Sequence, residues 1–145
     1  MGRGTGFGRT FELATRPSNP GYSVDVGLRD DVRRLLLLEE CWNTFSNIGA
    51  SVRSTRRKIA EAEALAIAAG GEAGPYRVFA CWVVRDAPRN RAVIERYPQI
   101  FEATFSGDSA QWVRALTRRD VTPPTGLGLV WCEPRRGRLT PWRPR

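Results

Sequence analysis

The sequence predicts an α/β domain with a mixed β-sheet flanked by helices and a C-terminal β-hairpin. Three observations predict this fold. Strand-like runs fill the first third of the chain, a long amphipathic helix separates the two most apolar runs, and a hairpin pattern closes the chain. With 145 residues, 41% hydrophobic and 26% charged, the chain is large and apolar enough for one domain with its own core.

The N-terminal part of the sheet is predicted as three strands. Residues 1–8 are Gly-rich, and we expect them to be disordered. Alternating apolar residues predict strands at 9–15 and 22–28, separated by the turn-forming sequence RPSNPG. A hairpin turn at 29–33 then leads into a third strand, 34–42, whose four successive leucines indicate burial.

A long helix follows the third strand. Asn47 is a plausible N-cap, and Gly70 and Gly71 are expected to end the helix. Between them an apolar stripe advances in steps of three and four, through Ile48, Val52, Thr55, Ile59, Ala62 and Ala66. The next run, 76–86, is apolar on both faces, as in a strand covered on both sides, so we expect a right-handed β-α-β crossover.

The last third of the chain predicts two short helices and a hairpin. The helices are expected at 87–97 and 107–116, the second capped by Asp108 or Ser109. Residues 127–143 have the pattern of a hairpin. We therefore expect three parts: a disordered N-terminus, one α/β domain and a basic hairpin packed on it, with boundaries at residues 1–8, 9–117 and 118–145.

The net charge of +8 is concentrated at the ends of the chain. Residues 1–24 hold three Arg and one Glu, and residues 118–145 hold seven Arg, one Asp and one Glu. Such basic ends suit an acidic partner such as nucleic acid, and DNA is the partner we expect. The alternative is that these arginines are simply solvated.

Several classes of function are excluded or disfavoured by composition. No apolar run approaches the roughly 20 residues of a membrane span, and the N-terminus does not resemble a secretory signal. The chain has no His, which removes Ser/His and Cys/His catalysis and any His-ligated metal. Three cysteines without His make no zinc pattern, so we interpret them as reduced thiols of a cytoplasmic protein.

Two carboxylates are the candidate chemical groups. Asp25 lies on the second predicted strand and Glu40 at the end of the third, and antiparallel strands joined by a short turn can place them side by side. Two hard oxygen ligands suit Mg²⁺, which could activate water for phosphodiester hydrolysis. Glu39 is the less favoured alternative because it should point to the other face. Both carboxylates could also be ordinary polar residues.

Four short motifs resemble the PD-(D/E)XK restriction-endonuclease-like domain found in actinobacterial helix-turn-helix (XRE-type) regulator proteins. They are YSVDVG, LLLLEECWNTFSNIG, RRKIAEA and CWVVRDAPRNR, and the likeness spans about residues 11–105. The resemblance implies a restriction-endonuclease-like fold in which Asp25 and Glu40 are catalytic and bind the metal, with Mg as cofactor in an active enzyme.

The sequence departs from that family in two places. The lysine of the E-x-K motif is Trp42 here, and the indole has an N–H donor but no charge. Only ten residues precede Phe11, where the fold normally has a helix, so either that helix is dispensable or the chain is a shortened form.

Lys58 is the candidate replacement for the missing lysine. The chain holds 22 Arg and this single Lys, which lies beside the apolar stripe of the long helix. In some nucleases of the resembled fold the basic residue has moved to that helix. The alternative is a solvated or phosphate-binding charge between Arg56 and Arg57.

Other residues have two interpretations each. Trp42 and Asn43 could shape a pocket at the strand end, or Trp42 could pack against the following helix. Trp131 and Trp142 could stack on exposed bases or pack across the terminal hairpin. The expected nucleic-acid contacts are Arg53, Arg56, Arg57, Arg135 and Arg136, although Arg57 could instead pair with Glu61.

The favoured hypothesis is a DNA-associated, nuclease-like domain with a degenerate active site that binds and regulates without chemistry or cofactor. One alternative is an active Mg-dependent nuclease that uses Asp25, Glu40 and Lys58. Another is a protein-interaction domain with a protein partner or a second copy of the chain. None of these hypotheses involves a membrane.

Overall fold

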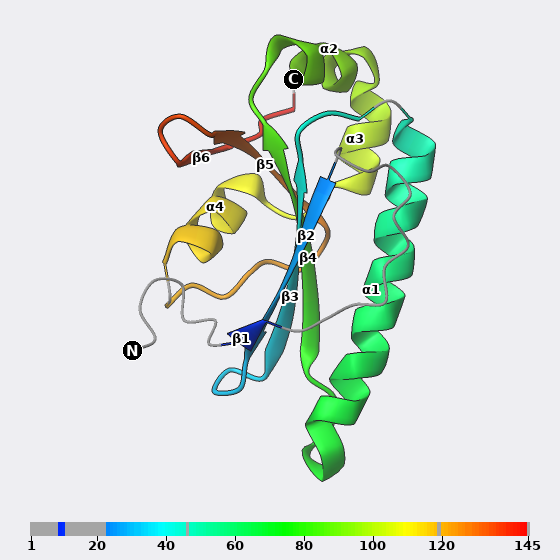
Figure 1. Ribbon diagram of the computed structural model, residues 1–145, viewed down its shortest axis with the longest axis vertical. Helices are drawn as coiled ribbons and strands as arrows, with labels where there is room; N and C mark the ends of the chain where they lie inside the picture. The colour runs from blue at the N-terminus through cyan, green and yellow to red at the C-terminus, as the bar shows by residue number, and fades with distance from the viewer. Residues whose placement is uncertain (1–8, 11–22, 46, 119, 145) are drawn as a thin grey trace.

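The computed structural model describes residues 9–10, 23–45, 47–118 and 120–144. The expected disorder of residues 1–8, the rest of the first predicted strand and the turn before the second lie outside these residues. The described strands form one six-stranded sheet whose order follows the chain, from β1 to β6 (Figure 1). They are β1 (Arg9–Thr10), β2 (Ser23–Asp30), β3 (Leu35–Trp42), β4 (Arg77–Arg85), β5 (Gly128–Glu133) and β6 (Arg138–Pro141).

The sheet is mixed. β2 is antiparallel to β3, β3, β4 and β5 run parallel, and β5 is antiparallel to β6. The helices are α1 (Ile48–Gly70), α2 (Pro88–Arg96), α3 (Pro98–Thr104) and α4 (Ser109–Thr117), with a 3-10 turn η1 (Gly71–Ala73). The predicted α/β fold with a mixed, helix-flanked sheet and a C-terminal hairpin is therefore confirmed, and that hairpin is continuous with the sheet through β4 and β5.

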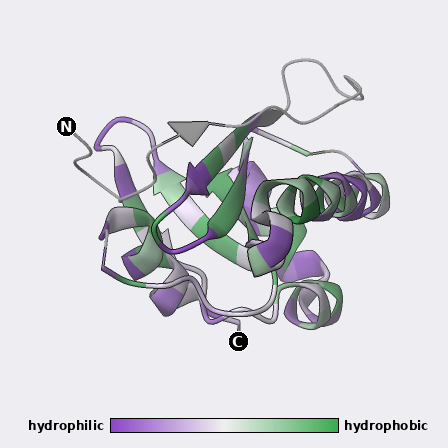
Figure 2. Cartoon of the chain, turned by 90° about the horizontal axis from the view of Figure 1, so that it is seen from below, coloured by the Kyte–Doolittle hydropathy of each residue, from purple (hydrophilic) through white to green (hydrophobic). Residues whose placement is uncertain are grey.

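Helices cover both faces of the sheet. α1, α2 and α3 pack on the face that carries Trp42, Trp82 and Trp131, and α4 packs on the opposite face. Figure 2 shows the hydrophobic residues concentrated along the central strands between these helices. Within the described residues, no helix combines the length and the apolar character needed to cross a bilayer.

The first hairpin turn lies slightly later than predicted. β2 continues through Asp30, so the turn is at residues 31–34 rather than 29–33. The Asp30 carboxylate accepts hydrogen bonds from the backbone N–H groups of Val32 and Arg33, each at 2.9 Å, and Arg34 takes a positive φ of 57°. A side chain that closes the turn through two backbone donors fixes its position.

α1 begins as predicted, but its buried face differs from the predicted stripe. The Asn47 side chain accepts a hydrogen bond from the Ala50 N–H, which is the expected N-cap. The buried residues are Ser51, Thr55, Lys58, Ala62, Ala66 and Gly70, whereas three predicted apolar positions, Ile48, Val52 and Ile59, are only half-buried. The helix is rotated because its polar side chains find polar partners on the sheet.

Candidate functional site

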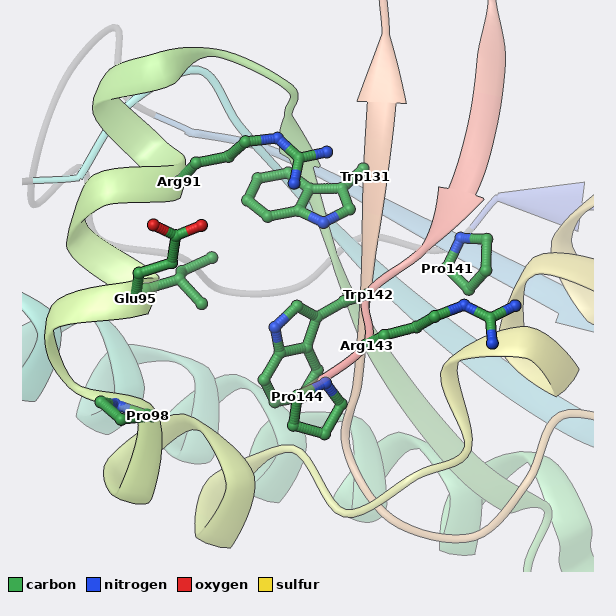
Figure 3. Close-up of a pocket in the computed structure, with 9 residues that line it drawn as sticks. Arg91, Glu95, Pro98, Trp131, Pro141, Trp142, Arg143 and Pro144 are labelled. Carbon is green, nitrogen blue, oxygen red and sulfur yellow. The ribbon is translucent and has the colours of Figure 1, made fainter.

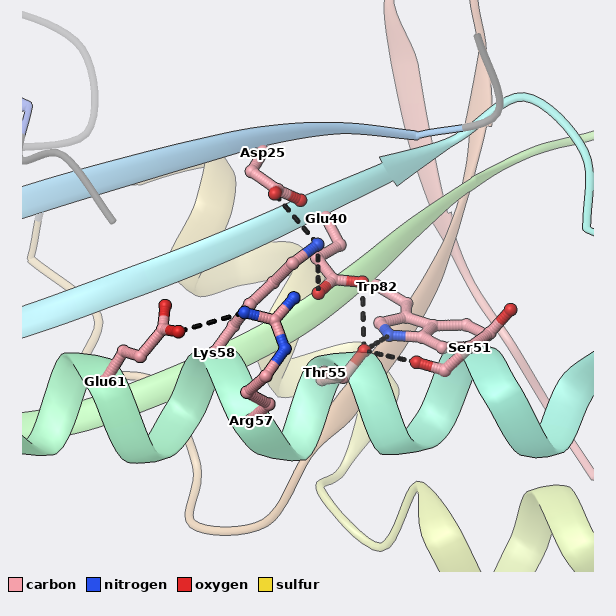
Figure 4. A network of polar contacts seen from close by, with 8 residues as sticks. All are labelled: Asp25, Glu40, Ser51, Thr55, Arg57, Lys58, Glu61 and Trp82. Atoms are coloured by element: carbon pink, nitrogen blue, oxygen red, sulfur yellow. Dashed lines mark hydrogen bonds and ion pairs between the residues drawn. The ribbon is translucent and has the colours of Figure 1, made fainter. Parts of the chain in front are cut away.

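Asp25 and Glu40 stand directly opposite each other on the antiparallel strands β2 and β3. Their side chains lie on the face of the sheet that α1 covers (Figure 4). The short hairpin between the strands sets this register, and the buried leucines of β3 orient Glu40, because adjacent residues on a strand point to opposite faces. The predicted juxtaposition of the two carboxylates is therefore present in the structure.

Lys58 completes a triad with these two carboxylates. Its Nζ lies 2.8 Å from Asp25 Oδ2 and 3.3 Å from Glu40 Oε1. Glu40 is 1% exposed and Lys58 is 4% exposed. Lys58 is thus not a solvated charge on the helix. Its ammonium is held between two acids from neighbouring strands, and we call Asp25, Glu40 and Lys58 the triad.

A second layer of polar contacts orients Glu40. Thr55 Oγ1 donates a hydrogen bond of 2.9 Å to Glu40 Oε2 and accepts one of 2.8 Å from Trp82 Nε1. The same hydroxyl lies 3.1 Å from the carbonyl oxygen of Ser51 one helical turn earlier, as Figure 4 shows. Sequence reasoning placed Thr55 in an apolar stripe and assigned no polar contact to Trp82, and so missed this network.

A sequence signal exists for only one of these neighbours. Thr55 precedes Lys58 by three residues, a spacing that puts both side chains on one helix face. Trp82 is the register partner of Glu40 on β4, so its indole lies beside that carboxylate. Finding the second contact needs the strand register, which no local pattern provides.

Electrostatics at the triad shift the pKa of the Glu40 carboxyl upward. Burial raises the pKa of the Glu40 carboxyl, while the Lys58 ammonium and the Thr55 hydrogen bond lower it in part, and the Asp25 charge raises it. Burial also raises the pKa of Glu39, which occupies the other face of β3. An additional positive charge near Glu40 would therefore lower the free-energy cost of burying this carboxylate in its ionised form.

The donor set fits a divalent cation. Asp25 Oδ1 and Glu40 Oε1 are buried and accept no hydrogen bond from the described residues, although Glu40 Oε1 is at ion-pair distance from Lys58. With both carboxylates ionised, the triad would carry one negative charge in excess. Among the described residues no group of three or more Cys, Asp or Glu could hold a metal, but Mg²⁺ commonly takes one or two protein carboxylates and keeps its waters.

Trp42, which the sequence resemblance aligns with the E-x-K lysine, belongs to the core. It is 4% exposed and packs against Phe45 and Trp82, with ring centroids 6.0 and 4.9 Å away. The structure thus places Trp42 in the buried core, in the same cluster as Phe45 and Trp82. Asn43 is exposed and accepts a hydrogen bond of 2.9 Å from Arg85.

The predicted nucleic-acid contacts do not form one surface. Arg53 and Arg56 are exposed on α1, and Arg57 pairs with Glu61 at 2.9 Å, which was the alternative for that residue. The remaining two, Arg135 and Arg136, are exposed in the turn between β5 and β6. Figure 1 shows that turn on the other side of the molecule from α1.

In comparisons with known proteins, no family model, no curated protein and no solved structure matches the chain. The resemblance to PD-(D/E)XK nucleases thus stays a prediction that depends on the sequence motifs. Function is inferred below from the geometry of the triad and its neighbours.

Proposed function

We propose that the chain is a metal-dependent nuclease-type domain that hydrolyses phosphodiester bonds in DNA at the triad. One observation carries the proposal: the Lys58 ammonium lies 2.8 and 3.3 Å from the facing carboxylates of Asp25 and Glu40. Trp42 cannot supply the charge of the E-x-K lysine. Lys58 brings that charge to the same carboxylate from α1, so the two acids and the positively charged residue of such a site are together.

Each member of the triad has a role in this proposal. Asp25 Oδ1 and Glu40 Oε1 would hold Mg²⁺, since both are buried and lack a hydrogen bond from the described residues. Bound there, the ion would act as a Lewis acid and lower the pKa of a coordinated water. Lys58 donates hydrogen bonds and offsets negative charge on the phosphate. Thr55 holds the orientation of Glu40 through its 2.9 Å hydrogen bond.

Exposure indicates the side from which the substrate approaches. The Asp25 side chain keeps 20% of its surface exposed, against 5% for Lys58 and 1% for Glu40. A phosphate would therefore meet the triad from the side of Asp25, at β2. Enclosure of the other two side chains strengthens their electrostatic interactions, because the local dielectric is low.

The test is cleavage of plasmid and single-stranded DNA by the purified chain with Mg²⁺ or Mn²⁺, against EDTA. Asp25→Asn is expected to abolish metal-dependent cleavage and the binding of Mn²⁺ measured by electron paramagnetic resonance. Glu39→Gln is the matched control, since it removes a neighbouring carboxylate on the opposite face of β3, and it should keep both. Absence of both cleavage and Mn²⁺ binding in the folded wild type would refute the proposal.

A second candidate is DNA binding without cleavage, the hypothesis that the sequence alone favours. The burial of Glu40 and Lys58, at 1% and 4% exposure, supports it, because charges that pair with each other can hold α1 on the sheet without any catalytic role. In this case the folded chain binds DNA with an affinity that falls steeply with salt. Asp25→Asn leaves that affinity unchanged, and neither protein binds Mn²⁺.

A further inference from the structure

A cavity of about 400 Å³ lies between α2 and the C-terminal hairpin (Figure 3). Its lining includes Trp131 and Trp142 together with Arg91, Ile94 and Glu95 of α2. Its volume is within the range of about 300–1,000 Å³ that small-molecule sites occupy. None of the triad residues lines this cavity, which we call the tryptophan pocket.

The tryptophan pocket is held in shape by the fold. Trp131 lies on β5, and Trp142 directly follows β6, with exposed fractions of 4% and 9%. The Trp142 backbone N–H donates a hydrogen bond of 2.8 Å to Ser109 Oγ. That hydroxyl in turn donates one of 2.6 Å to the Leu129 carbonyl, so the chain at Trp142 is tied to both α4 and β5.

The lining combines two indole side chains with polar groups. The Arg91 guanidinium lies 4.4 Å from the ring centroid of Trp131 and is fixed by two hydrogen bonds, 2.6 and 3.0 Å, to the Asp86 carboxylate. The indole N–H groups of Trp131 and Trp142 donate to none of the described residues. Glu95 provides a carboxylate acceptor in the same lining, as Figure 3 shows.

We propose that the tryptophan pocket binds an unpaired base of single-stranded DNA. A nucleobase is planar and apolar on its faces, and its edge carries acceptors for the indole N–H groups and donors for Glu95. The C-terminal segment 118–145, which supplies both tryptophans, has seven Arg against two acidic residues, and this charge complements a phosphate backbone. A base held in a duplex is not free to enter such a cavity, so the proposal concerns single strands.

This site goes beyond phosphodiester hydrolysis and does not require it. The first experiment measures binding of fluorescent short oligonucleotides to the full chain in EDTA, where metal-dependent cleavage is absent. A base-bearing single strand is expected to bind at least about fivefold more tightly than an abasic strand of equal length. It should also bind more tightly than the duplex. Equal affinity for the abasic strand would overturn the proposal, since the phosphates alone would then explain binding.

The second experiment locates the bound base. An oligonucleotide carrying iodouracil, irradiated with the wild-type chain, is expected to crosslink to the peptide that contains Trp142 or Trp131. Crosslinks confined to other peptides would overturn the assignment. This measurement needs no variant, so it stays informative if Trp142→Leu fails to fold. If Trp142→Leu folds, it should lose the base-dependent gain, by which we mean the tighter binding of the base-bearing strand relative to the abasic strand. Arg138→Ala, which lies outside the pocket lining, should keep this gain.

Two further experiments separate the pocket from a free-nucleotide site and from base recognition at the triad. AMP should displace the oligonucleotide only at far higher concentration. Displacement at equal concentration would identify a free nucleotide as the ligand and overturn the single-strand assignment. Asp25→Asn, which is expected to abolish cleavage, should retain the base-dependent gain. Loss of that gain in folded Asp25→Asn would place base recognition at the triad and overturn the pocket.

Discussion

The Nζ atom of Lys58 lies 2.8 Å from Oδ2 of Asp25. This ion pair joins α1 to β2, the strand next to β3 in the sheet. The chain has 22 arginines and only this lysine. An ammonium is a compact point charge that fits between two carboxylates, whereas the planar guanidinium needs a wider, forked partner. The choice of lysine at this one position therefore matches the enclosed geometry.

Removing the Lys58 charge should destabilise the fold. Lys58→Met keeps much of the apolar stem but leaves the Asp25 and Glu40 carboxylates facing each other without a cation. Loss of one member of a buried ion pair typically costs about 3–5 kcal/mol. We expect a decrease of that size in the free energy of unfolding, measured by urea denaturation at neutral pH.

Two controls accompany this measurement. Arg56→Met removes an exposed charge from the same helix and should change the free energy of unfolding by no more than about 0.5 kcal/mol. The double variant Lys58→Met/Asp25→Asn should recover part of the loss, because one carboxylate charge is gone. A double variant less stable than Lys58→Met would contradict the pairing.

Thr55 is expected to contribute through its hydroxyl. Thr55→Val keeps the shape of the side chain but leaves both Glu40 Oε2 and the Trp82 N–H without their hydrogen bonds. Each buried group left unsatisfied costs about 1–3 kcal/mol. Thr55→Ser retains the hydroxyl and should be clearly more stable than Thr55→Val in thermal or urea unfolding. Equal stability of the two variants would show that the hydroxyl contributes nothing.

The strands and the main helix could be predicted because their patterns are local. The leucine run of β3, the doubly apolar β4 and the caps Asn47 and Asp108 each carry their signal within a few residues. α3 (Pro98–Thr104) was not predicted, since its seven residues are too few to show a periodicity. It is stabilised by burial of Phe101 in the core.

The triad was predictable in its members but not in its geometry. Because the turn after β2 is short, the pairing of Asp25 with Glu40 could be inferred from the sequence. Whether Lys58 reached them depended on the rotation of α1 about its axis. That rotation follows from the contacts of Thr55 with Glu40 and Trp82, which are set by tertiary packing and leave no periodic trace.

Asp30 provides a pH-dependent contribution to stability away from the triad. Burial raises the pKa of its carboxyl, but the hydrogen bonds from the Arg33 backbone and guanidinium outweigh this effect and lower the pKa below 3.8. A depressed folded-state pKa stabilises the protein above the unfolded value of about 3.9. This stabilisation is lost as the pH falls through the folded pKa.

Asp30→Asn should therefore be less stable than the wild type at neutral pH. The difference between the two free energies of unfolding should shrink as the pH is lowered below about 4. Urea denaturation of both proteins at a series of pH values measures it. A difference that stays constant down to the lowest pH would show that the Asp30 charge has no role in closing the turn.

Magnesium should stabilise the folded chain through the triad. A ligand that binds only the folded state adds about 2.7 kcal/mol at a concentration one hundred times its Kd. We expect Mg²⁺ to raise the urea midpoint of the wild type relative to EDTA, and to leave that of Asp25→Asn unchanged. The increase should be larger in Lys58→Met, because there the ion supplies the positive charge that the two carboxylates have lost. If Mg²⁺ raised the midpoints of the wild type and Asp25→Asn equally, the ion would be acting elsewhere, and Asp25 would be only the ion-pair partner of Lys58.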